Sequence, residues 1–423
     1  MSELPAPTAD APAPAIGAHA PRRAALAFVF VTVLLDMLAL GMIIPVLPRL
    51  IVGFVGGDTA RAAEMYGLFG TIWALMQFLW SPLLGALSDR VGRRPVILIS
   101  NFGLAADYVV MALAPTLGWL FIGRVVSGIT AASVPTASAY IADVTPPEKR
   151  AGAFGMLGAA FGLGFVLGPA LGGLLGGADP RLPFWVAAGL SLTNACYGMF
   201  VLPESLPRAR RAGFRWSRAN PVGALVLLRR HPELLGLSAV SFLSYLAHQV
   251  LPSTFVLYAG HRYGWGEREV GLTLAGVGVC TAVVQGGLIK PLVARLGERR
   301  ALLAGLLCGA SGFAIYGLAP TGLSFNLGIP VMALWGLAGP SCQGLMTRHV
   351  GASEHGQLQG AQSSLTGITG LIGPGLFSWT FARALDPHIS LPGAPYLLAA
   401  GLLVLAMGMA AFASRAAGRS VPP

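Results

Sequence analysis

The sequence predicts an all-α membrane protein with twelve transmembrane helices in two homologous six-helix halves. Three observations predict this fold: the composition, the spacing of the apolar runs and an internal repeat. Of the 423 residues, 55% are hydrophobic and only 11% are charged, whereas soluble domains carry about 25% charged residues. A chain of this composition needs a bilayer around it, which excludes an ordinary soluble domain.

The apolar residues gather in twelve runs, each long enough to cross the hydrocarbon core of a bilayer. The predicted spans are 25–48, 67–88, 96–115, 118–141, 151–175, 183–203, 236–258, 270–292, 300–320, 325–347, 357–383 and 394–414. We therefore expect a disordered cytoplasmic N-terminal tail (1–23), a first half (24–203), a cytoplasmic central loop (204–233), a second half (234–415) and a C-terminal tail (416–423).

The Lys and Arg residues fall mainly on one side of the predicted membrane. With the N-terminus inside, the tails and even-numbered loops hold 21 of the 28, and the odd-numbered loops hold six. Because cytoplasmic loops are enriched in Lys and Arg, both termini are predicted to be cytoplasmic. The net charge of +11 then reflects topology and contact with anionic lipid, and nucleic-acid binding is not expected.

An internal repeat relates the two halves. The segment "DRVGRRP" (89–95) is similar to "ARLGERR" (294–300), and "GFVLGPALGG" (164–173) is similar to "TGLIGPGLFS" (369–378). Both matches have the same offset of 205 residues. Many secondary transporters consist of two such repeats around a central site.

Two carboxylates, Asp36 and Asp107, lie inside predicted spans. A charge at mid-bilayer costs roughly 2.5–3.5 kcal/mol on insertion scales, so a function in proton coupling or substrate contact is expected. The alternative is a structural acid that is hydrogen-bonded to a neighbouring helix. Arg124, in the fourth span, either pairs with one of these acids or faces a cavity. His248, in the seventh span, either carries a proton or is only hydrogen-bonded.

A charged loop between the second and third spans is expected to act as a gate, or simply as a positive anchor on the inside. Its residues are Gly85, Asp89, Arg90, Gly92, Arg93 and Arg94. Its glycines permit a tight turn and close helix approach. In the second half Ala294 replaces Asp89, so a gate that depends on this carboxylate is asymmetric.

The fifth span contains a run of small residues. They are Gly164, Gly168, Pro169, Gly172 and Gly173. Their spacing predicts one helix face that packs closely on a neighbour, and the proline loosens one backbone hydrogen bond.

Four motifs resemble signatures of the major facilitator superfamily and, within it, of the drug:proton antiporters. They are "GALSDRVGRRP" (85–95), "GRVVSGITAA" (123–132), "GFVLGPALGG" (164–173) and "LDMLALGMIIPVLP" (35–48). Through "ADYVVMALAP" (106–115), "AYIADVTPPEKRAGAFG" (139–155) and other segments, the chain resembles tetracycline efflux antiporters over almost its whole length.

The resemblance implies the major facilitator fold and export of a drug-like substrate, such as tetracycline as its Mg²⁺ chelate, in exchange for protons. Asp36 and Asp107 correspond to membrane acids important for that exchange, and Gln77, Arg124 and Gln285 fall on polar positions of the family. The resemblance further implies a bacterial inner membrane and the proton gradient as energy source. We expect a monomer without cofactor or resident metal, whose partners are substrate, protons and lipid.

Two positions depart from the family. Thr281 stands where the family has a histidine, and Gly309 stands where it has an aspartate. The cargo therefore stays open: the alternative is a proton-coupled transporter of another small metabolite, or a multidrug exporter that does not use tetracycline. An enzyme is not expected, since the seven histidines are scattered and no HExxH, GxSxG or P-loop pattern occurs.

Overall fold

The computed structural model describes residues 20–131, 133–211, 227, 231, 233–351 and 354–417. These residues form helices joined by short connections, and no strand occurs among them. Most of the predicted N-terminal tail (1–23), of the central loop (204–233) and of the C-terminal tail (416–423) lies outside the described residues.

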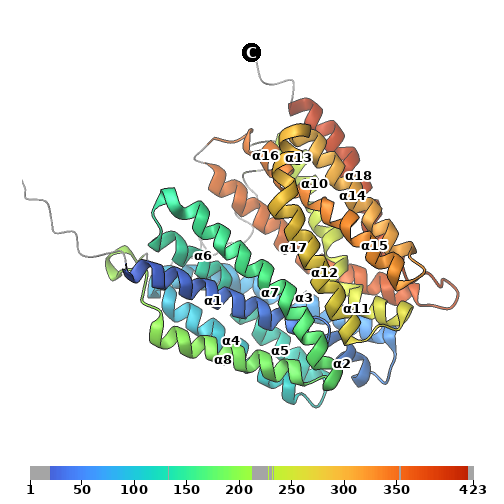
Figure 1. Cartoon of the computed structure of the whole chain (residues 1–423), viewed down its shortest axis with the longest axis horizontal. Coiled ribbons are helices and arrows are strands. Elements are labelled where there is room, and N and C mark those ends of the chain that lie inside the picture. The colour runs from blue at the N-terminus through green and yellow to red at the C-terminus, as the bar shows by residue number, and fades with distance from the viewer. Residues whose placement is uncertain are drawn as a thin grey trace, which may run out of the picture.

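Each predicted half is a bundle of helices (Figure 1). The first half comprises α1 (Ala20–Ile43), α2 (Leu47–Phe54), α3 (Thr59–Val91), α4 (Arg93–Leu113), α5 (Leu117–Thr130), α6 (Ser133–Val144), η1 (Pro147–Lys149), α7 (Arg150–Ala178) and α8 (Leu182–Val201), followed by η2 (Arg208–Arg210). The second half comprises α10 (Glu233–His248), α11 (Val250–Tyr263), α12 (Glu267–Val283), the π-turn η5 (Val284–Leu288), α13 (Ile289–Leu296), α14 (Glu298–Leu318), α15 (Gly322–Ala333), η6 (Leu334–Leu337), α16 (Ala338–Thr347), α17 (His355–Ala384) and α18 (Ala394–Ala417).

The predicted membrane fold is confirmed. In the described chain, eleven helical segments are long and apolar enough to cross a membrane. The twelfth predicted span is α17, which is 30 residues long but has a polar first part, "HGQLQGAQSS". The second span, α3, begins at Thr59 rather than at the predicted residue 67, because Asp58 caps it by accepting a hydrogen bond from the backbone N–H of Arg61 (3.0 Å).

The first and fourth spans of each half are interrupted at equivalent places. In the first half α1 ends at Ile43 before α2 begins at Leu47, and α5 ends at Thr130 before α6 begins at Ser133. At the repeat offset of 205, these breaks correspond to Gln249, between α10 and α11, and to η6, between α15 and α16. The duplication predicted from two short motifs therefore extends to the irregularities of the backbone.

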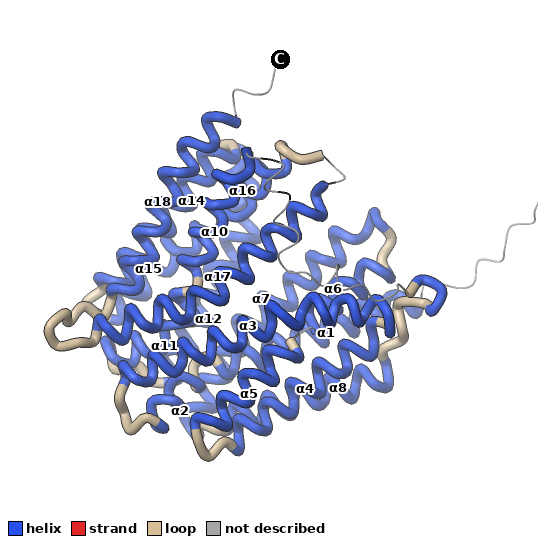
Figure 2. The backbone as a smooth tube through the Cα atoms, turned by 180° about the vertical axis from the view of Figure 1, so that it is seen from behind, coloured by secondary structure: helices blue, strands red, loops and turns tan. Residues whose placement is uncertain are grey.

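The two halves form a V (Figures 1 and 2). They pack together through α3 with α17 and α7 with α12, and they diverge toward the end of the molecule where α1 begins and α18 ends. We call that end the inner side, following the predicted orientation, and the opposite end the outer side.

Glycine contacts show that the outer side is closed and the inner side open. At Gly271 a Cβ atom would lie 2.4 Å from the carbonyl oxygen of Pro169 and 3.0 Å from Cα of Gly173. On the inner parts of the same helices, a Cβ at Gly155 or Gly287 would meet no atom of a neighbouring helix within 4 Å. The structure therefore has the two halves joined on one side only.

The small residues of α7 divide between two neighbours, which corrects the prediction of a single face. Gly164, Gly168 and Gly172 pack on α1; a Cβ at Gly172 would lie 2.1 Å from the carbonyl oxygen of Met42. Gly173 instead packs on α12 of the other half. Consecutive residues point about 100° apart on a helix, so Gly172 and Gly173 cannot both pack on the same neighbouring helix.

We predict that Gly172→Ala destabilises the protein, because the added methyl group meets the backbone of α1. Overpacking of this kind costs about 1–3 kcal/mol, measurable as a lower midpoint of thermal unfolding in detergent. Gly177→Ala is the matched control, since a Cβ there meets no neighbouring helix within 4 Å. Equal midpoints for the two variants would show that α1 accommodates the added methyl group without loss of stability.

Candidate functional site

Asp36 is buried between α1 and α8, with 4% of its surface exposed. The side-chain amide of Asn194, on α8, donates to Oδ1 of Asp36 (3.1 Å) and to the carbonyl oxygen of Thr32 (3.2 Å). The structural alternative considered for Asp36, a hydrogen bond to a neighbouring helix, is therefore present. Asn194 was missed in the sequence, where a lone amide in the sixth span is its only signal.

Asp107 is fully buried on α4, where it faces α5. Gly123 makes room for it, because a Cβ at that position would lie 2.7 Å from Oδ1 of Asp107. The next residue, Arg124, is 8% exposed, and its charge acts on Asp107. The Arg124 guanidinium carbon lies 5.5 Å from the ring centroid of Trp73 on α3, a cation–π contact.

The structure brings these charged residues together inside the first half. Tyr108, on α4, lies within electrostatic reach of Asp36, Asp107 and Arg124. All three are buried. Gln77 is not part of this cluster and is half-buried on α3.

The second half places an ionisable residue at a helix break. His248 ends α10, and its side chain is exposed. Its ring centroid lies 5.9 Å from that of Trp335, in the broken segment η6 of the tenth span. In the central parts of the six second-half spans, His248 is the sole Asp, Glu, Lys, Arg or His; these parts are 237–258, 273–288, 303–318, 325–345, 360–380 and 396–412.

Trp335 also explains one departure from the family. A Cβ at Gly309 would lie 2.7 Å from Cγ and 2.8 Å from Cδ1 of the indole. An aspartate therefore does not fit at this position in this chain. Thr281 is half-buried on α12, and Gln285 is exposed in η5.

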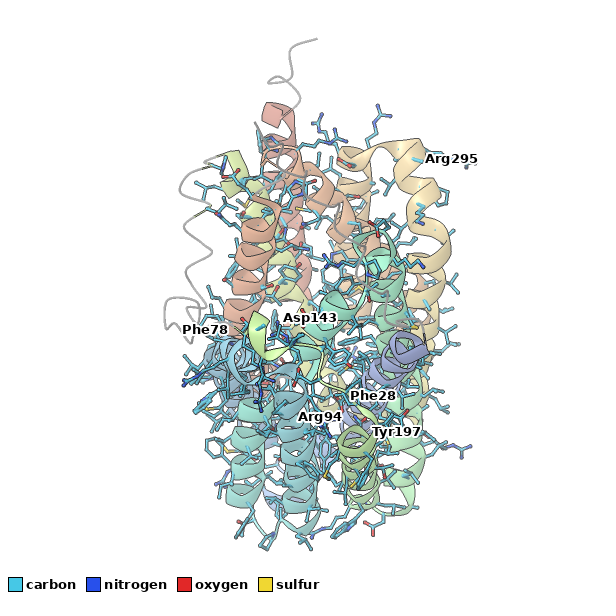
Figure 3. All side chains as sticks on the ribbon, turned by 90° about the vertical axis from the view of Figure 1, so that its left-hand side faces the viewer. Phe28, Phe78, Arg94, Asp143, Tyr197 and Arg295 are labelled. Carbon is cyan, nitrogen blue, oxygen red and sulfur yellow. The ribbon has the colours of Figure 1, made fainter. Side chains whose placement is uncertain are left out.

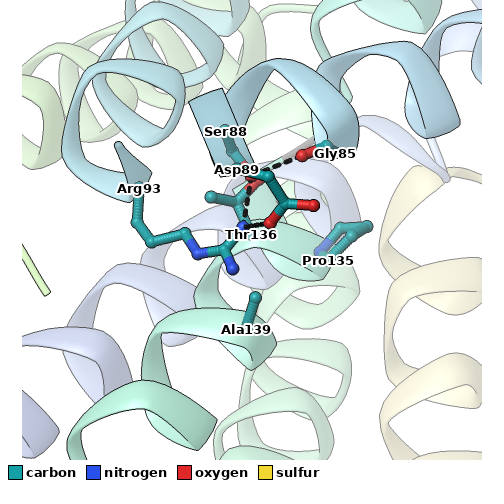
Figure 4. Close-up of a pocket in the computed structure, with 7 residues that line it drawn as sticks. All are labelled: Gly85, Ser88, Asp89, Arg93, Pro135, Thr136 and Ala139. Carbon is teal, nitrogen blue, oxygen red and sulfur yellow. Dashed lines mark hydrogen bonds and ion pairs between the residues drawn. The ribbon is translucent and has the colours of Figure 1, made fainter. Parts of the chain in front are cut away.

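The predicted loop cluster is tied together within the first half. Arg93 pairs with Oδ1 of Asp89 through Nη1 (2.6 Å) and with Oδ2 of Asp143 through Nε (3.0 Å). Its Nη1 also donates to Oγ of Ser88 (2.7 Å). Ser88, Asp89 and Arg93 line a cavity of about 230 Å³ together with Gly85, as Figure 4 shows. Asp89 therefore faces its own half in this structure.

The loop after α8 completes this cluster. The backbone N–H of Arg93 donates to Oε1 of Glu204 (2.8 Å), which caps the start of α4. Gly92 has φ +114°, and a Cβ there would lie 2.2 Å from Oε2 of Glu204, so only glycine fits. Arg94 donates to the carbonyl oxygen of Met199, whereas Arg90 is exposed.

On the outer side an ion pair joins the two halves. Nη1 of Arg49, on α2, lies 3.3 Å from Oε2 of Glu267, the first residue of α12. The two side chains are 31% and 16% exposed. This pair was missed in the sequence, since two charges at loop ends far apart in the chain carry no signal of contact.

On the inner side the charged ends of the halves lie apart. Figure 3 labels Asp143 and Arg94 on the first half and Arg295 on the second, well separated in that view. No group of three or more His, Cys, Asp or Glu side chains in the described part of the chain could hold a metal ion.

Comparison with known proteins agrees with this architecture. Residues 29–374 match the model of the Major Facilitator Superfamily. The chain is 37% identical over 361 residues to the class C tetracycline resistance protein of Escherichia coli, covering 85% of this chain and 90% of that protein. It is 38% identical over 346 residues to the class G tetracycline resistance protein of Vibrio anguillarum, covering 80% and 86%. The human organic anion transporter MFSD10 has a similar crystal structure, with a TM-score of 0.68, 25% identity, and 92% of this chain and 99% of that chain covered.

We predict that Glu267→Gln opens the outer side more often, because it breaks the ion pair with Arg49. A partly exposed pair contributes about 0.2–1 kcal/mol, which corresponds to about a 1.4- to 5-fold effect. The measurement is the rate at which maleimide labels Ser378→Cys, a residue buried in the closed interface against Gly67, in a variant whose four native cysteines are replaced. Arg268→Gln, the exposed neighbour, is the control. Unchanged labelling in Glu267→Gln would show that the ion pair does not help to keep the outer side closed.

Proposed function

Since this chain belongs to the Major Facilitator Superfamily of membrane transporters, and within it to the tetracycline resistance proteins, we propose that it exports a drug-like molecule in exchange for protons. The proton gradient is the energy source, and no cofactor takes part. The protein works as a monomer in a bacterial inner membrane, with both termini in the cytoplasm. Transport of a small molecule as such follows from the family.

The burial of Asp36 and Asp107 is the main observation that supports this function. Both carboxylates lie in membrane-spanning helices with 4% and 0% of their surface exposed. Ionisable residues inside membrane spans mark proton relays and ion pathways in transporters. Asn194 donates to Oδ1 of Asp36, so this acid also has a hydrogen-bond donor on a second helix.

Exchange requires that the site opens to each side in turn, and one face of α7 is available for this movement. On the closed outer side Gly173 lies on Gly271. Gly155 lies about five helical turns before Gly173 and so on the same face of α7. Gly155 meets no neighbouring helix now, so this face of α7 is free to pack on the second half when the inner side closes.

The charged loop is proposed to take part in the same movement. α3 and α17 pack antiparallel, with Gly67 against Ser378 on the outer side. Followed inward, this pairing sets Asp89 opposite the first turn of α17, which begins at His355. A carboxylate is stabilised at a helix N-terminus, so Asp89 exchanges Arg93 for the start of α17 when the inner side closes.

The broken helices of the second half are proposed to bind the cargo. In many transporters, substrates bind near mid-bilayer at discontinuous helices. His248 and Trp335 lie at the two breaks of this half, with ring centroids 5.9 Å apart. An imidazole beside an indole suits a flat aromatic molecule with polar edges. Gln77 and Gln285, from opposite halves, add amide groups.

Tetracycline, carried as its Mg²⁺ chelate, is the first candidate cargo, because the relatives reported above are named tetracycline resistance proteins. One observation favours a different drug or small metabolite. Trp335 occupies the space beside Gly309, where the family resemblance leads one to expect an acid. The second half therefore offers His248 in place of a carboxylate, which changes the charge presented to a metal-bearing cargo.

We predict that tetracycline with Mg²⁺ releases protons from acidified inside-out vesicles that contain this protein. Asp36→Asn should reduce the release at least about tenfold, since it removes the ionisable group from the relay. Glu64→Gln, which neutralises an exposed acid on α3, is the matched control and should leave release unchanged.

Release with other aromatic drugs but not with tetracycline would support drug/proton exchange and show that the cargo is not tetracycline. Undiminished release in Asp36→Asn would contradict the role given to this acid.

We predict that His248→Gln raises the apparent KM for the cargo about tenfold, which corresponds to about 1.4 kcal/mol of binding free energy. The measurement is drug-dependent proton release at varied drug concentration, with the unfolding midpoint recorded for each variant. His261→Gln, an exposed histidine at the outer end of the same span, is the control. A KM that stays unchanged in His248→Gln would show that the cargo does not bind at His248.

A further inference from the structure

The inner ends of the two halves carry ion pairs at equivalent repeat positions, with the charges exchanged. In the first half Nε of Arg93 lies 3.0 Å from Oδ2 of Asp143. In the second half Nη2 of Arg348 lies 2.8 Å from Oε2 of Glu298. Arg93 corresponds to Glu298, and Asp143 corresponds to Arg348, both at the repeat offset of 205.

The surroundings of the two pairs are otherwise alike. Arg93 begins α4 and Glu298 begins α14, the third spans of their halves. Each follows a glycine with positive φ, +114° at Gly92 and +74° at Gly297. The repeat has therefore kept the backbone and the pairing while reversing the sign of both charges.

The exposure of the side chains shows which members are available to new partners. Arg348 is 68% exposed although it is paired, whereas Arg93 is 12% exposed. Arg93 is also held by Asp89 and Ser88, so it keeps partners if Asp143 moves away. To leave its present place, Arg348 gives up its contact with Glu298, and Asp143 gives up Arg93 and the hydroxyl of Ser205 (3.2 Å).

We propose that Asp143 and Arg348 form an inner latch, an ion pair between the two halves that exists when the inner side is closed. The inference rests on the alternating access of the proposed function and adds the residues that hold the closed state. It does not depend on the identity of the cargo.

The reversal of charge is what makes the latch possible. Asp143 ends α6 and Arg348 follows α16, and these helices lie at the inner ends of opposite halves, on the two sides of the gap (Figures 1 and 2). Equivalent residues of a two-fold repeat approach each other at the same depth when the halves close. If position 348 carried the same charge as position 143, closure would bring two acids together. The reversed charge instead brings the Asp143 carboxylate to the Arg348 guanidinium.

The latch is the counterpart of the ion pair on the outer side. Arg49 and Glu267 join the halves where they are closed now, and Asp143 and Arg348 join them where they are open now. When one side closes and the other opens, one pair between the halves forms as the other breaks.

Disulfide trapping tests the latch directly. The two substitutions Asp143→Cys and Arg348→Cys are introduced together into the full chain without its four native cysteines, in membranes, with Glu267→Gln added to favour an open outer side. The pair Gly85→Cys and Gly360→Cys reports closure of the inner side, because each position lies 18 residues, or five helical turns, inward of the contact between Gly67 and Ser378. In the control, Asp143→Cys is combined with Arg299→Cys, because Arg299 begins the same helix as Glu298 but donates to the carbonyl oxygen of Ala411 on α18.

We expect the latch pair to crosslink to the same extent as the closure reporter, and at least fivefold more than the control. Closure without a crosslink between positions 143 and 348, or an equal crosslink in the control, overturns the latch and leaves alternating access standing. Failure of the closure reporter as well contradicts the proposed movement itself, and the latch with it.

A double-mutant cycle that keeps the native backbone and side-chain size gives an independent test. Closure of the Gly85 and Gly360 reporter is measured in Asp143→Asn, Arg348→Gln and the double variant. A latch predicts that each single change lowers closure about two- to fivefold and that the double variant is no worse than either. Effects that multiply would show that each residue serves only the pair within its own half. Arg348→Lys, which keeps the charge, should retain most of the closure.

Discussion

Close contact of helix backbones at glycine is the interaction on which the rest of this structure depends. In a bilayer, apolar side chains gain little by leaving lipid, so helices are held together by van der Waals packing and polar contacts. Helix α7 makes such contacts on two faces: Gly172 fixes it to α1 within its own half, and Gly173 sets it against α12 of the other half. One helix therefore belongs firmly to the first bundle and is also the surface on which the second bundle rests.

The polar groups divide unequally between the halves. The first half buries Asp36, Asp107 and Arg124 within the bundle, where Asn194 donates to Asp36. The second half has a single histidine in the central part of its spans, exposed at a helix break beside Trp335. In the proposed cycle the proton and the cargo are held mainly by different halves, so the movement of one half against the other is what couples them.

The ion pairs at the two ends suit a molecule that must not remain in one state. Arg49 with Glu267 is partly exposed, as is Arg348 with Glu298, and such pairs contribute about 0.2–1 kcal/mol each. Contacts of this size bias an equilibrium between two arrangements without trapping either. In the proposed cycle, the exposed charges set how the two states are populated.

The sequence alone determined the membrane fold, the twelve spans, the duplicated halves and the acids inside the first half, because these depend on apolar run length, on repeat spacing and on the cost of a charge in lipid. Gly164, Gly168 and Gly172 were correctly placed on one face by their spacing of four residues, while Gly173 was not. Only the tertiary structure decided that Asn194 meets Asp36, that Trp335 fills the space at Gly309, and that Arg49 reaches Glu267. These contacts join residues far apart in the chain, and their distances depend on how the helices pack and on which side the halves are closed, neither of which the local pattern of residues encodes.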